Sequence, residues 1–113
     1  MAEIRKFDTG ATRDTDAGKI DYEGFSHPTV ELRYGQYMNK HRVQRDGELR
    51  DSDNWTRGIP VKEYMKSLYR HFMDVWMWHR TGKTISGKNI EEALCAVRFN
   101  TQGMLYEILR KKE

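Results

Sequence analysis

The side chains best suited to chemistry in this sequence lie in its C-terminal half. His71 and Asp74 are three residues apart, and Arg70 is adjacent to His71. On a helix this spacing gathers an imidazole, a carboxylate and a guanidinium within one turn. Such a group can grip a phosphate and its metal ion. The alternative is a plain ion pair between Arg70 and Asp74 beside a hydrogen-bonded core histidine.

A second set of oxygen ligands lies further along the chain. Glu92, Asn100 and Glu107 recur at helical spacing, separated by Ala96 and Gly103, so all five fall on one narrow helix face. Two carboxylates and an amide suit Mg²⁺ held against a phosphate, because magnesium prefers oxygen ligands and keeps several waters. The structural alternative is that Glu92 caps its helix, Glu107 is solvated and Gly103 marks close helix packing.

A long amphipathic helix is expected to position His71 and Asp74. Residues 59–79 repeat apolar side chains at a 3.6-residue period, and Pro60 suits a first helical turn. The repeating residues are Val61, Tyr64, Met65, Leu68, Tyr69, Phe72, Val75 and Trp76. This apolar arc is wider than a single stripe, so we expect the helix to be covered on more than one side.

Two further helices are predicted, over Thr29 to about His41 and from an Asn89 N-cap to about Arg110. The last helix has a predicted core stripe of Ile90, Leu94, Val97, Met104, Leu105 and Ile108, with Cys95, Phe99 and Tyr106 as a weaker stripe opposite. A helix that is apolar on two sides indicates self-association. No strand pattern is evident. We therefore predict a single all-α domain, a small bundle of three main helices completed by oligomerisation.

Two polar segments flank the first helix. Residues 1–26 read as an extended arm, whose Arg13, Lys19 and Asp21 either fold over a bound anion or stay solvated. Residues 42–58 form a polar loop with turn signals, and Trp55 within it either plugs a small core or stacks on a base. We expect His41 and His79 to be structural or exposed.

Composition excludes several classes of protein. The 20 Lys and Arg residues exceed the 17 Asp and Glu residues only slightly, and they are interleaved, so no nucleic-acid interface is expected. A single cysteine rules out an internal disulfide and a CxxC metal site. No apolar run reaches the ~20 residues of a membrane span, and no leader pattern is seen, which predicts a cytoplasmic protein.

A resemblance covers nearly the whole chain. In order, the motifs are Thr9-Gly10-Ala11-Thr12-Arg13, Gly18-Lys19-Ile20-Asp21-Tyr22, a Tyr-bearing helix, Asn54-Trp55-Thr56-Arg57-Gly58-Ile59-Pro60, Arg70-His71 and an EEALC-type helix. Together they resemble the bacteriophage proteins of the dATP/dGTP diphosphohydrolase N-terminal domain family. The resemblance implies a phage-encoded, all-α nucleotide-handling protein. It also implies a relation to the helical pyrophosphatases, which use Mg²⁺ to cleave a dNTP to monophosphate and pyrophosphate.

This chain departs from that family where many members carry an HxxH pair, since Asn89 and Glu92 stand there. It also lacks the ExxE…ExxD pattern of better-known helical pyrophosphatases. Either Glu91 and Glu92 replace the metal-binding function, or this branch binds nucleotides without cleaving them.

The resulting expectation is a homo-oligomeric nucleoside triphosphate pyrophosphohydrolase. Its site residues would be Glu91, Glu92 and Asp74 for Mg²⁺, His71 and Glu92 for catalysis, Arg70, Lys19, Arg13 and Asp21 for substrate, and Asn54 and Trp55 for the base. One alternative is a non-catalytic protein that sequesters a nucleotide or a cyclic-nucleotide signal of host immunity. Another is a structural or regulatory phage protein whose partner is a protein.

Overall fold

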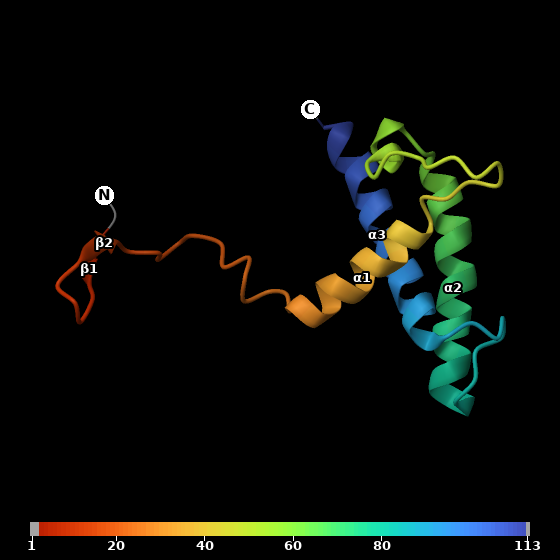
Figure 1. The fold of residues 1–113 in the computed structure, drawn as a ribbon, viewed down its shortest axis with the longest axis horizontal. Helices are drawn as coiled ribbons and strands as arrows, with labels where there is room; N and C mark the ends of the chain where they lie inside the picture. The colour runs from red at the N-terminus through yellow and green to blue at the C-terminus, as the bar shows by residue number, and fades with distance from the viewer. Residues whose placement is uncertain (1–2, 113) are drawn as a thin grey trace.

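The computed structural model describes residues 3–112, and it shows a mostly helical body with an N-terminal arm (Figure 1). The body consists of α1 (Pro28–Lys40), the 3₁₀ helix η1 (Asn54–Arg57), α2 (Val61–Thr81) and α3 (Ile90–Arg110). The predicted mostly helical character and the three main helices are confirmed, with ends within about two residues of those predicted.

The absence of strands was predicted wrongly. β1 (Ile4–Lys6) and β2 (Thr12–Asp14) pair antiparallel, with Ile4 opposite Asp14 and Lys6 opposite Thr12. In the turn between them, Phe7 N donates a hydrogen bond to Ala11 O at 3.0 Å and Gly10 N donates to Phe7 O at 2.9 Å. Gly10 adopts a φ of +90° there. Strands of three residues are too short to display a period of two, so the sequence pattern could not reveal them.

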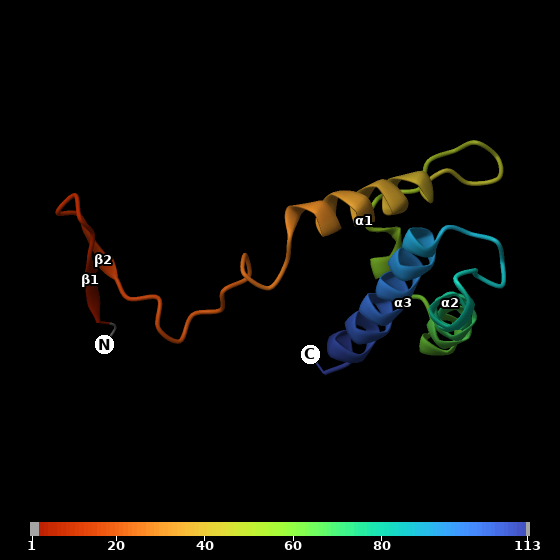
Figure 2. The same cartoon turned by 90° about the horizontal axis from the view of Figure 1, so that it is seen from below.

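This β-hairpin lies at the far end of the arm, away from the helices (Figures 1 and 2). The two strands contact each other, and neither contacts a helix. The radius of gyration is 19.4 Å, whereas a compact chain of this length has about 13 Å. Three large side chains of the arm, Ile20, Tyr22 and Phe25, are consequently exposed.

The helical body is built on an antiparallel pair of helices, α2 and α3, with α1 lying across one side of the pair (Figure 2). Tyr64 of α2 is 2% exposed, and its ring packs directly on Gly103 of α3, where a Cβ would overlap the ring. Ala93, Ala96 and Asn100 complete the buried face of α3. Small residues therefore allow the two helices to approach closely around one aromatic ring.

The predicted core stripe of α3 is wrong for three of its six residues, since only Ile90, Val97 and Met104 are half-buried. Leu94, Leu105 and Ile108 are exposed, whereas the narrow face containing Ala96, Asn100, Gly103 and Glu107 is buried. Helical periodicity identifies apolar faces but does not say which of two faces meets a partner within the same chain. Here the close fit of Tyr64 on Gly103 selects the small-residue face.

Local hydrogen bonds fix the link between α2 and α3. Gly82 ends α2 in the left-handed conformation with φ of +82°, and Asn89 Oδ1 accepts a hydrogen bond from Glu91 N at 2.7 Å. The predicted N-cap at Asn89 is confirmed. Buried Asp74 accepts hydrogen bonds from Ser86 N (2.9 Å) and Ser86 Oγ (2.7 Å), so the linker is held against α2.

Candidate functional site

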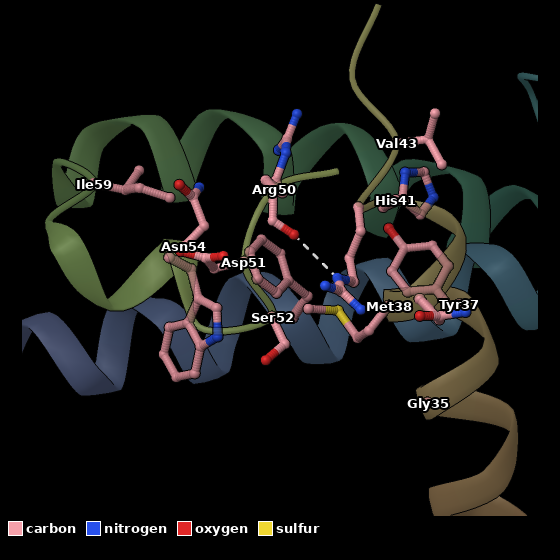
Figure 3. A pocket seen from close by; sticks show the side chains of 14 residues that line it. Gly35, Tyr37, Met38, His41, Val43, Arg50, Asp51, Ser52, Asn54 and Ile59 are labelled. Atoms are coloured by element: carbon pink, nitrogen blue, oxygen red, sulfur yellow. Dashed lines mark hydrogen bonds between the residues drawn. The ribbon is translucent and has the colours of Figure 1, made fainter. Parts of the chain in front are cut away.

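A cavity of about 460 Å³ opens between the end of α1, the following loop, η1 and α3 (Figure 3). Its lining residues are Gly35, Tyr37, Met38, Asn39, His41, Arg42, Val43, Arg50, Asp51, Ser52, Asn54, Trp55, Ile59 and Phe99. The volume falls within the ~300–1,000 Å³ typical of small-molecule sites. The lining combines aromatic rings with a few polar and positively charged groups, which is the usual make-up of a ligand pocket.

The loop that follows α1 places two arginines on the cavity. Asp46-Gly47 forms the turn, with Gly47 at φ +85° and Glu48 N donating to Asp46 Oδ1 at 2.9 Å. The chain then returns, so that Arg50 N donates to Arg42 O at 2.9 Å and Arg42 Nε donates to Arg50 O at 3.0 Å. The second of these hydrogen bonds is the dashed line in Figure 3.

The opposite wall is formed by Trp55 in η1. Its ring meets Tyr106 edge-on at a centroid distance of 5.1 Å and Phe99 at 6.4 Å. Arg110 of α3 donates a hydrogen bond to Thr56 O at 2.9 Å, which ties η1 to the same helix. Trp55 therefore both covers part of the core and lines the cavity, while its stacking on a base stays a prediction.

The cavity has a positive character. Within residues 3–112, neither Arg42 nor Arg50 has a carboxylate within ion-pair distance. The one lining carboxylate, Asp51, is paired with Arg57. A guanidinium group without an acidic partner suits a phosphate or carboxylate ligand, and the two groups point in different directions in Figure 3.

Burial perturbs two titratable groups at the cavity. It raises the pKa of the half-buried Tyr37 phenol to about 12, and it lowers the pKa of His41, with the nearby Lys40 charge acting in the same direction. The two rings are 4.4 Å apart between centroids. The neutral form of His41 is therefore favoured more than in a free imidazole.

His41 also links the cavity to two of the predicted catalytic residues. The charges of His41 and Glu92 affect each other's pKa, and the charge of His41 affects the pKa of His71. A hydrogen bond from Lys40 to Glu92 Oε1 lowers the pKa of Glu92. The second carboxylate oxygen, Oε2, is buried and accepts no hydrogen bond from the described residues. Burial lowers the pKa of His71, aided by Lys88 and Arg70. That second oxygen of Glu92 lies 3.8 Å from Arg33 Nη2, and Glu92 is not among the residues that line the cavity.

The other predicted metal ligands are engaged elsewhere. Glu91 pairs with Arg33 at 2.7 Å, and Asp74 binds Ser86 in the linker. Across residues 3–112, no group of three or more His, Cys, Asp or Glu side chains is arranged to hold a metal ion. The three predicted Mg²⁺ ligands therefore serve different contacts within this chain, and a metal would have to find further oxygen ligands from another source.

The predicted substrate-binding residues divide into two groups. Asn54 and Trp55 line the cavity, as described above. Arg13, Lys19 and Asp21 lie exposed in the arm, and Asp21 Oδ1 accepts a hydrogen bond from Gly24 N. Arg70 is exposed on α2 and donates to Ser67 at 3.1 Å. None of these four lines the cavity of its own chain.

Arg42 and Arg50 were not predicted as site residues, because only Asn54 and Trp55 of the polar loop were given a binding role. The sequence did hold a signal for their proximity: Arg42 lies four residues before Asp46, and Arg50 lies three residues after Gly47. A tight turn at that dipeptide places them across from each other. His41 was predicted to be structural or exposed, and the structure adds that it lines the cavity.

Comparison with protein-family models, curated proteins and solved structures gave no match for this chain. Among residues 3–112, no helix has both the length and the apolar character that crossing a membrane requires.

Proposed function

We propose that this protein binds a nucleotide in the cavity between α1, η1 and α3. The observation that carries the proposal is the presence of Trp55 and Asn54 in the same 460 Å³ cavity as Arg42 and Arg50. An aromatic ring and an amide recognise a base by stacking and hydrogen bonding. Two arginines without acidic partners recognise phosphate.

In this proposal the residues expected to contact the base stay the same, and the residues expected to contact the phosphates change. Asn54 and Trp55 keep their expected role, whereas Arg42 and Arg50 take the phosphate contacts that the resemblance implied for Arg70. His41 adds a switchable positive charge, since a phosphate beside an imidazole favours its protonated form. The nucleotides of the host cytoplasm are the expected ligands.

The test is a thermal-shift and calorimetric screen of the intact protein against dNTPs, NTPs and cyclic nucleotides. A ligand at about 100 times its dissociation constant should stabilise the fold by about 2.7 kcal/mol, a shift of several degrees for a domain of this size. Arg50→Ala should weaken binding at least 10-fold. The control is Arg70→Ala, an exposed arginine away from the cavity, which should leave affinity unchanged.

Three outcomes separate the alternatives. Binding of a cyclic nucleotide alone would favour sequestration of an immune signal. No response to any nucleotide would contradict the proposal and favour a protein partner. A larger loss in Arg70→Ala than in Arg50→Ala would return the phosphate site to α2.

Hydrolysis to a monophosphate and pyrophosphate is a second candidate function, favoured by the buried Glu92 oxygen that accepts no hydrogen bond from the described residues. The described side chains do not form a magnesium site by themselves. Magnesium commonly binds through one or two carboxylates together with substrate phosphates. A metal used by this protein should therefore arrive with the nucleotide.

Incubation with each dNTP and NTP plus Mg²⁺ or Mn²⁺, followed by chromatography, tests hydrolysis directly. Release of monophosphate and pyrophosphate, abolished by EDTA and by Glu92→Gln with the fold intact, would establish the enzyme. Binding without products would leave the protein as a nucleotide-binding protein. Unfolding of Glu92→Gln would instead show that the pairing of Glu92 with Lys40 is mainly structural.

A further inference from the structure

Four large apolar side chains form an unburied stripe along α2. Met65, Tyr69, Phe72 and Trp76 follow one another at intervals of four, three and four residues, and they are between 46% and 59% exposed. This is the heptad spacing by which one helix packs along another. In this chain, however, α3 contacts the neighbouring face of α2, around Tyr64.

A matching stripe runs along α3. Leu94, Leu105 and Ile108 are each about half exposed, and Thr101 continues their heptad spacing between them. Leu105 and Ile108 lie beyond the small-residue face that meets α2, on a side that neither α1 nor η1 covers. Leu94, at the other end of the stripe, borders a groove that is also lined by Val30 and Tyr34 of α1. All three apolar residues of the stripe were predicted to lie in the core, yet each is about half exposed.

Both stripes face the same side of the molecule. In a right-handed helix each residue advances by about 100°. On α2, the Met65–Trp76 stripe lies about a quarter turn or more beyond Tyr64, which faces α3. On α3, the Leu105–Ile108 stripe lies well beyond the face that meets α2. Because the two helices are antiparallel, both stripes point towards the same side of the pair. That side is opposite α1, which lies across the other face of the pair (Figure 2). The two stripes therefore form one continuous surface, here termed the open face.

We propose that the open face is a two-fold interface with a second copy of this chain, in which the two α2–α3 pairs complete a four-helix core. The spacing argues for a helical partner. The size is also suitable: half-exposed side chains of roughly 150–250 Å² each give on the order of 600 Å² per chain, near the ~800 Å² per partner of a standard interface.

The small core of a single chain supports the same conclusion. Among the described residues, the buried hydrophobic ones are Tyr64, Ala93, Cys95 and Ala96, three of which are small. The larger apolar side chains of α2 and α3 remain half exposed, and such residues need a partner to contribute their full hydrophobic stabilisation. An interface in which the face meets itself satisfies this need symmetrically.

This proposal is independent of nucleotide binding. The cavity lies on the side of α1 and η1, so a dimer formed through the open face leaves both cavities open to solvent. Ligand binding with one site per chain is therefore expected in the dimer, and failure of one proposal does not imply failure of the other.

Light scattering coupled to size-exclusion chromatography tests the interface on the intact chain. At high micromolar concentration the wild-type protein should have twice the 13.5 kDa mass of one chain. Tyr69→Glu and Leu105→Glu should each weaken association at least about 100-fold, because each would bury a charge. The control is Tyr22→Glu, which changes an even more exposed aromatic residue on the arm and should leave the dimer intact.

Each contrary result has a defined meaning. A monomeric wild-type chain would overturn the proposal whether or not the variants fold. Dimers that persist in folded Tyr69→Glu and Leu105→Glu would place the interface elsewhere. Loss of the dimer in Tyr22→Glu alone would assign association to the arm and would also contradict the proposal.

Discussion

Trp55 belongs both to the packing around α3 and to the lining of the candidate cavity. One part of its ring packs on Tyr106 and Phe99, and the same residue lines the cavity. The sequence predicted both possibilities but could not combine them. The pattern of a polar loop does not reveal that η1 lies on α3.

Replacing Trp55 should therefore affect stability and binding together. Trp55→Ala is expected to lower the free energy of unfolding by about 2 kcal/mol, below the ~3–5 kcal/mol of a fully buried Trp because the side chain is half-buried. It should also abolish measurable nucleotide binding. Urea denaturation and calorimetry measure the two effects. Trp55→Phe should restore most stability, and if it also restored full affinity, the indole would have no specific part in binding.

The two perturbed histidines predict how stability depends on pH. The folded-state pKa values of His41 and His71 lie below the ordinary value of 6.5, mainly through burial. Between the lowered pKa and 6.5 the unfolded chain binds more protons, so stability rises with pH across this range. Stability should thus fall as the pH is lowered from 7 towards 5.5.

Denaturant melts across this pH range check the sign. The lowered pKa values of Glu92 and Asp74 act only below their ordinary values of 4.5 and 3.8, so they do not mask the effect. A His41→Gln, His71→Gln double variant should flatten the dependence. An unchanged slope in that variant would assign the pH dependence to other groups.

At the scale of elements, the contact between α2 and α3 depends on one glycine. Gly103→Ala would place a Cβ inside the ring of Tyr64, which has no room to move because it is almost fully buried. We expect a loss of about 1–3 kcal/mol by overpacking. Thermal denaturation followed by circular dichroism measures it.

Gly35 supplies the matched control for this substitution. A Cβ at Gly35, inside α1, would meet no neighbouring atom. Gly35→Ala should therefore stabilise the protein by about 0.5–1 kcal/mol through helix propensity alone. If both substitutions changed stability in the same direction, the close fit of Tyr64 on Gly103 would not be what holds the helices together.

The helices themselves were predictable because their apolar periods and caps are local properties. How the helices pack on one another could be predicted only in part. Leu105 and Ile108 fit a core stripe as well as an interface stripe, and periodicity alone does not distinguish the two. Likewise, Glu92 and Asp74 share the chemistry of metal ligands, yet the contacts with Lys40 and Ser86 are set by tertiary structure.

At the scale of the whole molecule, two features extend beyond the single chain. The arm projects from the helices with its hairpin in contact with itself, and the open face leaves the larger side chains of α2 and α3 half exposed. The expectation of an oligomer arose from an α3 that is apolar on two sides. The stripe of Cys95, Phe99 and Tyr106, predicted to be the outer one, is covered within the chain. The stripe predicted to be the core forms part of the proposed interface instead.

The most direct test of the central claim is a nucleotide titration of the ¹⁵N-labelled protein followed by NMR. If the cavity binds a nucleotide, the indole N–H of Trp55 and the side-chain amide of Asn54 should shift and saturate at one ligand per chain. The indole of Trp78 and the backbone amide of Arg70, both outside the cavity, should not shift. Shifts confined to Arg13, Lys19 and the neighbouring arm, or no shifts with any nucleotide, would contradict the account.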